Sequence, residues 1–144
     1  QNVFGKPLAT ANNYIFNQED GDDADGSPMD GVFIESSDFD LQEGNSFTFV
    51  RRMIPDVKFY GTNVQSGVPQ INMLLKTRNA PSDSLTTRAT TDISNNTDQV
   101  HVRARGRQAV LRLQSDDDAA VDNRTGYKWR LGYTRLDINP DGRR

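Results

Sequence analysis

The residue type best suited to acid–base chemistry at neutral pH occurs once in this chain, as His101. Catalysis by a histidine needs a carboxylate or a nucleophile positioned beside it. His101 instead lies beside arginines on a predicted strand face, and no G-x-S-x-G turn presents a nucleophilic serine. The sequence therefore predicts that His101 is a structural or surface residue and that the chain is not an enzyme.

Carboxylates are the second group that could do chemistry. They cluster at residues 20–26 and 116–118, and several oxygen ligands close in sequence can bind calcium. If Gly26 is taken as the turn glycine of a calcium-binding loop, Gly21 stands where the first acidic ligand is needed. We therefore predict solvated turns, with no metal and no cofactor. The twenty acids also offer many pairs of the kind that glycosidases use, and the sequence singles out none of them.

Two further kinds of site are absent from the sequence. The glycine-rich motifs that cradle phosphates, G-x-x-x-x-G-K-[ST] and G-x-G-x-x-G, do not occur. The chain has no cysteine, so it can form neither a disulfide nor a thiolate metal site, which fits assembly in a reducing cytoplasm.

Arginines form the most regular pattern in the chain. From residue 100 to residue 107, small apolar residues occupy the even positions, and the odd positions are His101, Arg103, Arg105 and Arg107. This alternation predicts a strand with one buried face and one cationic face. Two functions are open for these arginines and for Arg112. They could pair with acidic groups across a subunit interface, which we favour, or contact nucleic acid. The aromatic residues that would support nucleic-acid contact are Tyr127, Trp129 and Tyr133.

The distribution of charge supplies acidic partners for these arginines. Residues 1–49 carry ten Asp or Glu and one Lys, a net charge of −9, whereas residues 50–144 carry ten acids and sixteen Lys or Arg, a net charge of +6. The whole chain carries −3, which is not the basic balance of a non-specific DNA-binding domain. The split therefore favours packing between charged surfaces of neighbouring copies.

Strand signals dominate the rest of the sequence. Short runs rich in β-branched and aromatic residues, each bounded by Gly, Pro, Asp or Asn, occur at residues 32–34, 47–50, 57–60 and 71–75. No window of helical length shows an uninterrupted amphipathic pattern. We therefore expect an all-β fold, either an antiparallel β-sandwich-like module or a propeller-associated one, with long polar loops.

The chain is predicted to divide into two parts. Residues 1–31 form a polar, acidic N-terminal arm or loop, and residues 32–144 form the antiparallel β module, with an irregular loop at residues 79–99. The hydrophobic content of 34% is low for a self-sufficient domain, so neighbouring subunits are expected to contribute stability. We expect no membrane insertion, because no apolar run is long enough to span a bilayer. From the start at Gln1 instead of Met we expect either a fragment or a processed piece of a protein.

Glycines mark two changes in the strand pattern. After Gly106 the apolar residues move from even to odd positions, and the parity changes again at Gly132, between Trp129 and Leu136. A one-residue slip would turn every side chain to the wrong face, so we predict a bulge or bend at each glycine. Residues 100–138 are predicted to form an antiparallel hairpin with a long polar loop. Trp129, the only tryptophan, is predicted to be a core or interface anchor.

Two segments of the sequence resemble a known family. The first comprises residues 34–41, Gly44 and residues 49–57. The second comprises residues 102–108 with an R-G-R-Q strand, residues 129–132 with the sequence W-R-L-G, and residues 135–144, which end in D-x-x-P-D-G-R-R. Together they resemble the C-terminal region of the tail nozzle, or packaged-DNA stabilisation, proteins of short-tailed bacteriophages (podoviruses). The resemblance covers roughly residues 32–78 and 100–144. In the terminal motif, Pro140 fixes φ and Gly142 accepts a positive φ, which predicts a turn.

This resemblance implies a structural virion protein without catalytic residues. Family members form a homohexameric, β-rich ring or tail tube below the portal and adaptor rings, which retains the packaged DNA and forms part of the DNA ejection channel. The implied partners are other copies of the chain, the adaptor and fibre proteins of the viral tail, and viral double-stranded DNA in transit. The implied location is the virion tail, after assembly in the cytoplasm of the bacterial host.

A binding module of a different class remains as the alternative. A β-sandwich carbohydrate-binding module, used for receptor binding, would need an exposed platform of aromatic side chains. Most aromatic residues here fall at predicted inward positions.

Overall fold

The computed structural model describes residues 5, 7–17, 31–60, 70–115 and 128–142 of the chain. These residues form strands and no helix, so the prediction of an all-β fold is confirmed. The twelve strands among the described residues are β1 (Leu8–Ala11), β2 (Tyr14–Asn17), β3 (Phe33–Glu35), β4 (Phe39–Asp40), β5 (Thr48–Ile54), β6 (Val57–Tyr60), β7 (Gln70–Arg78), β8 (Thr86–Ser94), β9 (Val100–Gly106), β10 (Gln108–Ser115), β11 (Lys128–Leu131) and β12 (Arg135–Pro140).

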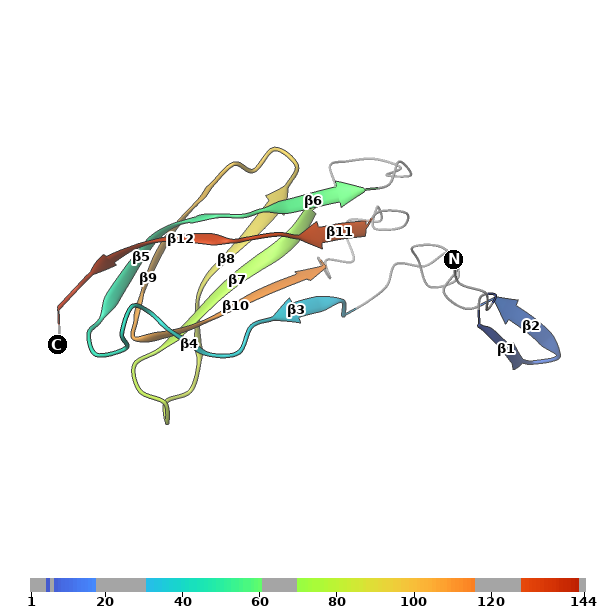
Figure 1. Cartoon of the computed structure of the whole chain (residues 1–144), viewed down its shortest axis with the longest axis horizontal. Helices are drawn as coiled ribbons and strands as arrows, with labels where there is room; N and C mark the ends of the chain where they lie inside the picture. Colours follow the sequence, from blue (N-terminus) through green and yellow to red (C-terminus); the bar gives the residue numbers. More distant parts are fainter. Residues whose placement is uncertain (1–4, 6, 18–30, 61–69, 116–127, 143–144) are drawn as a thin grey trace.

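Strands β3 to β12 build an antiparallel sandwich of two layers (Figure 1). The first sheet has the order β3-β10-β7-β8, and β4 also pairs with β10. The second layer has the order β12-β5-β9 and is continued by the pair β11-β6. It is continuous because only Pro55 and Asp56 separate β5 from β6, and the partners of these two strands, β12 and β11, also follow each other closely.

The core lies between the two layers and follows from strict alternation in the central strands. In β7, Ile71, Met73 and Leu75 are fully buried while the residues between them are half-buried. In β9, Val100, Val102 and Ala104 are buried, and His101, Arg103 and Arg105 are exposed, as the alternation in the sequence predicts. Burial of each Val, Ile, Leu or Met side chain in this core stabilises the fold by about 1.5–3 kcal/mol.

The irregular loop predicted for residues 79–99 is wrong, because β8 occupies residues 86–94 and pairs along β7. β8 is an edge strand, and only Ile93 among its side chains is fully buried. Its sequence therefore lacks a strong alternation of apolar and polar residues. The strand signal that remains is its four threonines, whose β-branched side chains suit a pleated surface.

The hairpin predicted for residues 100–138 is also wrong. β9 and β10 follow each other in sequence but belong to different sheets. β11 pairs with β6, and β12 pairs with β5, so neither pairs with β9 or β10. The alternation of apolar residues reports which face of a strand is buried, and it does not report which strand lies beside it.

The parity changes at Gly106 and Gly132 coincide with the ends of strands, and a bend of the kind predicted lies beside Gly106. Gly106 ends β9, and the chain bends through Arg107 into β10 of the opposite sheet. Gly132 follows β11, and its N–H donates to the carbonyl oxygen of Asp56 at 2.6 Å, opposite the break between β5 and β6. The register shifts within ladders lie elsewhere, for example between Asp137 and Ile138. Gly106 is therefore at a bend and Gly132 follows the end of a strand, and neither lies at a register shift of a described ladder.

The N-terminal part contains a hairpin that the sequence analysis did not predict. β1 and β2 pair through a two-residue turn in which Asn12 and Asn13 have φ values of 49° and 66°. Two successive positive φ values are typical of a type I′ turn, which asparagine favours. The hairpin stands apart from the sandwich (Figure 1).

Candidate functional site

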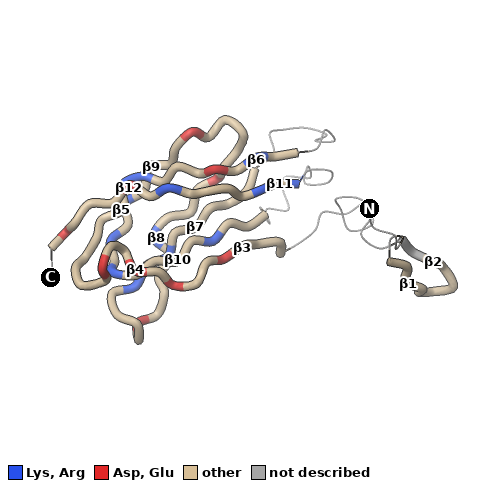
Figure 2. The backbone as a smooth tube through the Cα atoms, in the orientation of Figure 1, with Lys and Arg blue, Asp and Glu red and all other residues tan. Residues whose placement is uncertain are grey.

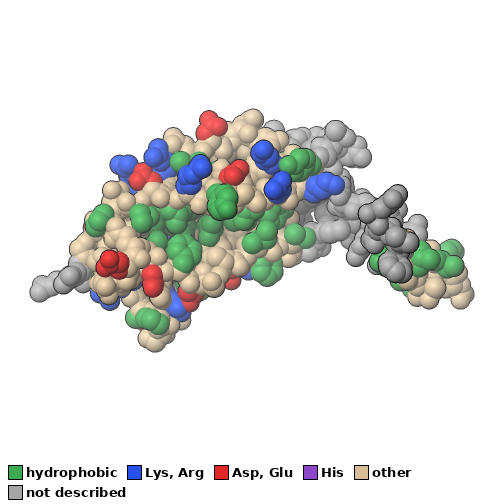
Figure 3. All heavy atoms as spheres, in the orientation of Figure 1, with side chains coloured by type: hydrophobic (Ala, Val, Ile, Leu, Met, Phe, Trp, Pro, Cys, Tyr) green, Lys and Arg blue, Asp and Glu red, His purple; other side chains and the backbone are tan. Residues whose placement is uncertain are grey.

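Charged side chains lie on the outer faces of both sheets, and they differ in how fully they are paired. On the first sheet, acidic positions of the β3–β4 segment lie beside basic positions of β7 and β10 (Figure 2). On the second layer, Lys and Arg side chains gather over β9, β12 and β11 (Figure 3).

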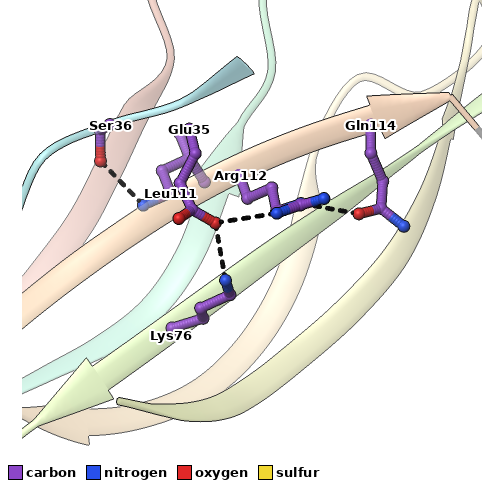
Figure 4. Close-up of polar contacts among 6 residues, drawn as sticks. All are labelled: Glu35, Ser36, Lys76, Leu111, Arg112 and Gln114. Carbon is purple, nitrogen blue, oxygen red and sulfur yellow. Dashed lines mark hydrogen bonds and ion pairs between the residues drawn. The ribbon is translucent and has the colours of Figure 1, made fainter. Parts of the chain in front are cut away.

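Glu35 on β3 is the centre of the polar cluster on the first sheet (Figure 4). Its carboxylate accepts from Lys76 Nζ at 2.6 Å and from Arg112 Nη1 at 3.4 Å. Arg112 also donates from Nε to Gln114 Oε1 at 2.8 Å, and its guanidinium lies 3.8 Å from the ring centre of Phe33. The hydrogen bond from Lys76 holds the pKa of Glu35 below its ordinary value; desolvation opposes this shift and Arg112 adds to it.

A second chain of contacts continues along the same face. Asp38 forms an ion pair with Arg78, and Arg78 donates from Nε to Gln108 Oε1 at 2.8 Å. Gln108 in turn donates from Nε2 to Asp40 Oδ1 at 2.8 Å. Acidic residues of the N-terminal third therefore pair with basic and amide side chains of β7 and β10 within one chain.

The arginines predicted to form one interface ladder have different surroundings. Arg105 forms an ion pair with Asp141, and its guanidinium lies 3.9 Å from the ring centre of Phe47. Arg107 lies in the bend after β9, with its guanidinium 4.8 Å from the same ring. Arg103 is exposed and forms no ion pair with any residue that the structure describes. The cationic face of β9 is therefore neutralised at one end and open in the middle.

Arg112 is not part of this ladder, because β10 belongs to the other sheet. The structure instead adds arginines of β5 that sequence analysis missed. Arg51 and Arg52 share the carboxylate of Asp137 on β12, with N···O distances of 2.9 Å and 3.3 Å. The hydrogen bond from Arg51 lowers the pKa of Asp137. One carboxylate serves two guanidinium groups here, so this face keeps an excess of positive charge.

A polar pocket of about 290 Å³ lies where β8 and β9 come together, and it is lined by Asn79, Arg88, Arg103 and Arg105. Arg88 is held by a hydrogen bond from its Nε to Thr77 Oγ1 at 3.3 Å. The lining contains three guanidinium groups and no carboxylate. Such a pocket can accept a single anionic group, a carboxylate or a phosphate.

Sequence analysis missed Lys76 and Arg78, which bind the acidic residues of the first sheet. A signal for them exists, because they alternate with the buried Leu75 and Thr77 in the same period of two that marks residues 100–107. Arg88 carried no such signal, since the strand that contains it has only one strongly apolar residue on its inner face.

The residues predicted to have structural roles lie as follows. Trp129 packs partly buried against the core, and its indole N–H donates to Ser115 Oγ at 3.3 Å. Pro140 ends β12, and Gly142 has a φ of 79°. Phe47 binds this turn through two backbone hydrogen bonds, to the carbonyl of Gly142 at 2.7 Å and from the N–H of Asp141 at 2.8 Å. The terminal turn is therefore fixed to the start of β5.

The described part of the chain contains no group of three or more His, Asp or Glu side chains that could hold a metal ion. The acidic runs 20–26 and 116–118, and also Tyr127, lie outside the described residues. His101 is exposed on β9. No helix that could cross a membrane occurs in the described ranges.

No family model, curated protein or solved structure matches this chain.

Proposed function

We propose that this chain is a structural component of a short-tailed phage virion, a tail nozzle or tail tube protein that forms part of the DNA ejection channel and retains packaged DNA. In this proposal it acts by assembly and has no catalytic role. Two features support it, the resemblance in two segments of the sequence and the way in which those segments meet in the fold.

The observation that carries the proposal is that separate pieces of the resembling sequence contact one another. Arg105 of the R-G-R-Q strand forms an ion pair with Asp141 of the terminal motif. At the end of the W-R-L-G strand, the Gly132 N–H donates to the carbonyl of Asp56, and the Tyr133 N–H donates to the Asp56 carboxylate at 3.1 Å. Short motifs that are distant in sequence and adjacent in space are expected of a shared structural framework. Here the pieces of the resembling sequence are neighbours in one sandwich.

The unequal pairing of the two sheets also suits a protein that assembles with copies of itself. Lys76 and Arg78 of the first sheet pair with acids of their own chain, whereas Arg103 on the second layer forms no ion pair with any described residue and lines a pocket together with Arg88 and Arg105. An acidic group of a neighbouring subunit is the partner that we assign to this pocket.

Genome binding is the competing assignment for these arginines. A cationic channel wall would hold DNA phosphates through counterion release and would slow the passage of the genome. We therefore place Arg103, Arg105 and Arg107 outside the channel, at a subunit boundary.

The alternative function, a carbohydrate-binding sandwich, has less support. Such modules present aromatic rings side by side to stack on sugar rings. Among the described residues, the exposed aromatic side chains of the sandwich lie on three different elements: Phe33 on β3, Tyr60 on β6 and Tyr133 after β11. The ring of Phe33 is also occupied by the guanidinium of Arg112.

Electron microscopy of the phage particle tests the proposal. Gold-coupled antibody raised against this chain should label the tail below the portal. A density map of the particle should show the sandwich repeated in a ring that has the symmetry of the nozzle. The proposal would be refuted if mass spectrometry did not detect the chain in purified particles, or if the gold labelled the capsid shell. A glycan array probed with the same chain should stay blank; specific binding there would favour the carbohydrate-binding function.

A further inference from the structure

The β1–β2 hairpin exposes apolar side chains that the described part of its own chain does not cover. Leu8 and Ile15 are 65% and 73% exposed. Ile15 lies opposite Thr10, two residues from Leu8, so Leu8 and Ile15 share one face of the hairpin. Among the described strands, β1 and β2 pair only with each other. A lone two-stranded hairpin is marginally stable in water, so this hairpin needs a further surface.

The sandwich has one closed side and one open side. On the closed side, formed by the edge strands β8 and β9, Ile93, Val100 and Val102 are at most 5% exposed. On the open side, between the β3–β4 edge and the β12–β11 edge, the inward-facing Ile34 is 49% exposed. Other apolar residues on these two edges are only partly buried: Phe39, Trp129, Leu131, Leu136 and Ile138.

Two properties make the open side a surface for docking. Hydrophobic side chains form a band along it (Figure 3). Among the strands that the structure describes, β3, β11 and β12 border this side, and each of them has a neighbouring strand on one side only. Free strand edges next to exposed apolar side chains are the features to which an added strand or hairpin binds.

We propose that the β1–β2 hairpin of one copy covers the open side of the sandwich of a second copy. The two surfaces are different, so the contact is head-to-tail. Repeated contacts of this kind close into a ring when the rotation between copies permits it. The inference goes beyond the proposed function, because it concerns how copies join and holds whether or not the assembly belongs to a virion.

A second copy is the occupant that position and charge favour. In its own chain the hairpin stands away from the sandwich and leaves the open side uncovered (Figure 1). The sequence that follows the hairpin, residues 18–32, contains six acids and no Lys or Arg. The β12–β11 edge of the open side carries the exposed side chains Lys128, Arg130 and Arg135. A docked hairpin would therefore bring an acidic segment to a basic edge.

The test uses the whole chain and two variants, each of which removes one half of the contact. The hairpin variant carries Leu8→Ser and Ile15→Ser, and the open-side variant carries Ile34→Lys. Analytical ultracentrifugation should show that the wild-type chain self-associates. Self-association of the hairpin variant should be at least about a hundredfold weaker, because burial of each such side chain contributes about tenfold or more to affinity.

Mixing the two variants tests the head-to-tail geometry. The hairpin variant keeps an intact open side, and the open-side variant keeps an intact hairpin. The mixture should therefore form a pair that contains one molecule of each and grows no further. Leu85→Ser is the matched control, because Leu85 is a 38% exposed leucine in the turn before β8 and should be irrelevant to association.

Trp129 reports the docking directly, since it is the only tryptophan and lies partly buried on the open side. Its emission should shift to shorter wavelength as the wild-type chain associates. A wild-type chain that stays monomeric up to its solubility limit overturns the inference, and so does a hairpin variant that associates like the wild type. The wild-type chain could also stay monomeric and have Trp129 emission at shorter wavelength than the hairpin variant. That result would mean that the hairpin folds back on its own chain, and it would also overturn the inference. None of these outcomes depends on the location of the chain in a particle.

Discussion

Replacing Gly106 with alanine should destabilise the sandwich by about 1–3 kcal/mol, the range for an overfilled core. A Cβ atom at this buried position would lie 2.7 Å from the Cβ of Thr77 and 3.3 Å from the carbonyl oxygen of Arg78. Carbon atoms in contact are normally about 3.5–4.0 Å apart. Rotation of the Thr77 side chain gives no relief, because its Cβ is fixed to the backbone. The two sheets must therefore move apart where the chain passes from one to the other.

This movement would also lengthen hydrogen bonds that join the sheets. Thr77 Oγ1 donates to the carbonyl oxygen of Arg105 at 3.0 Å, and the Arg107 N–H donates to the carbonyl oxygen of Arg78 at 3.1 Å. The loss of one such bond costs about 1 kcal/mol, which lies within the same range.

Urea denaturation followed by the fluorescence of Trp129 measures the change in the free energy of unfolding. Gly5→Ala is the matched control, since a Cβ there meets nothing within 4 Å and stability should not change. In a double-mutant cycle, Thr77→Gly should remove most of the additional cost of the alanine, whereas Thr77→Ser keeps the Cβ and should remove none. Unchanged stability of the Gly106→Ala variant would refute the close approach of the sheets. An equal cost in the Thr77→Gly background would refute this contact as its cause.

Three further predictions concern the charged surfaces and the second glycine. Glu35→Gln should lower stability by about 0.5–1 kcal/mol at neutral pH, because two partly exposed cations lose their partner. The fold lowers the pKa of Glu35 from its ordinary value of 4.5, so its contribution is present above that value and is lost as pH falls through the lower folded pKa. In urea titrations the difference in stability between the two proteins should therefore be largest at neutral pH and become smaller as pH falls below 4.5; a difference that stays constant with pH would contradict the assignment. Gly132→Ala should lower the melting temperature in calorimetry, since its Cβ would overlap the Asp56 carboxylate, which accepts a hydrogen bond from the Tyr133 N–H; an unchanged melting temperature would exclude this contact. Replacing three arginines with serine should weaken assembly, measured by light scattering, and leave the weak DNA affinity of the isolated chain unchanged in filter binding. These three are Arg103, Arg105 and Arg107. Tight, salt-sensitive DNA binding that the substitutions abolish would instead assign them to the genome.

The sequence by itself determined the strands that have strong alternation and which of their faces are buried. Val100, Val102 and Ala104 are buried and the arginines between them are exposed, because successive side chains of a strand point to opposite faces. The strand breaks at Gly106 and Gly132 could be predicted for the same reason, since a strand cannot change parity without a break. The strand β8 could not be predicted, because an edge strand that buries only one large apolar side chain shows no clear alternation of apolar and polar residues.

Tertiary structure alone decided which strands are neighbours and which charges meet. β9 and β10 are adjacent in sequence and lie in opposite sheets, so Arg103 and Arg112 never share a face. Arg105 meets Asp141, and Arg112 meets Glu35, across sequence separations of 36 and 77 residues. The alternation of apolar and polar residues along a strand indicates only which side chains are buried. The identity of its partner depends on how the whole set of strands packs its apolar faces into one core, and that is a property of the assembled fold.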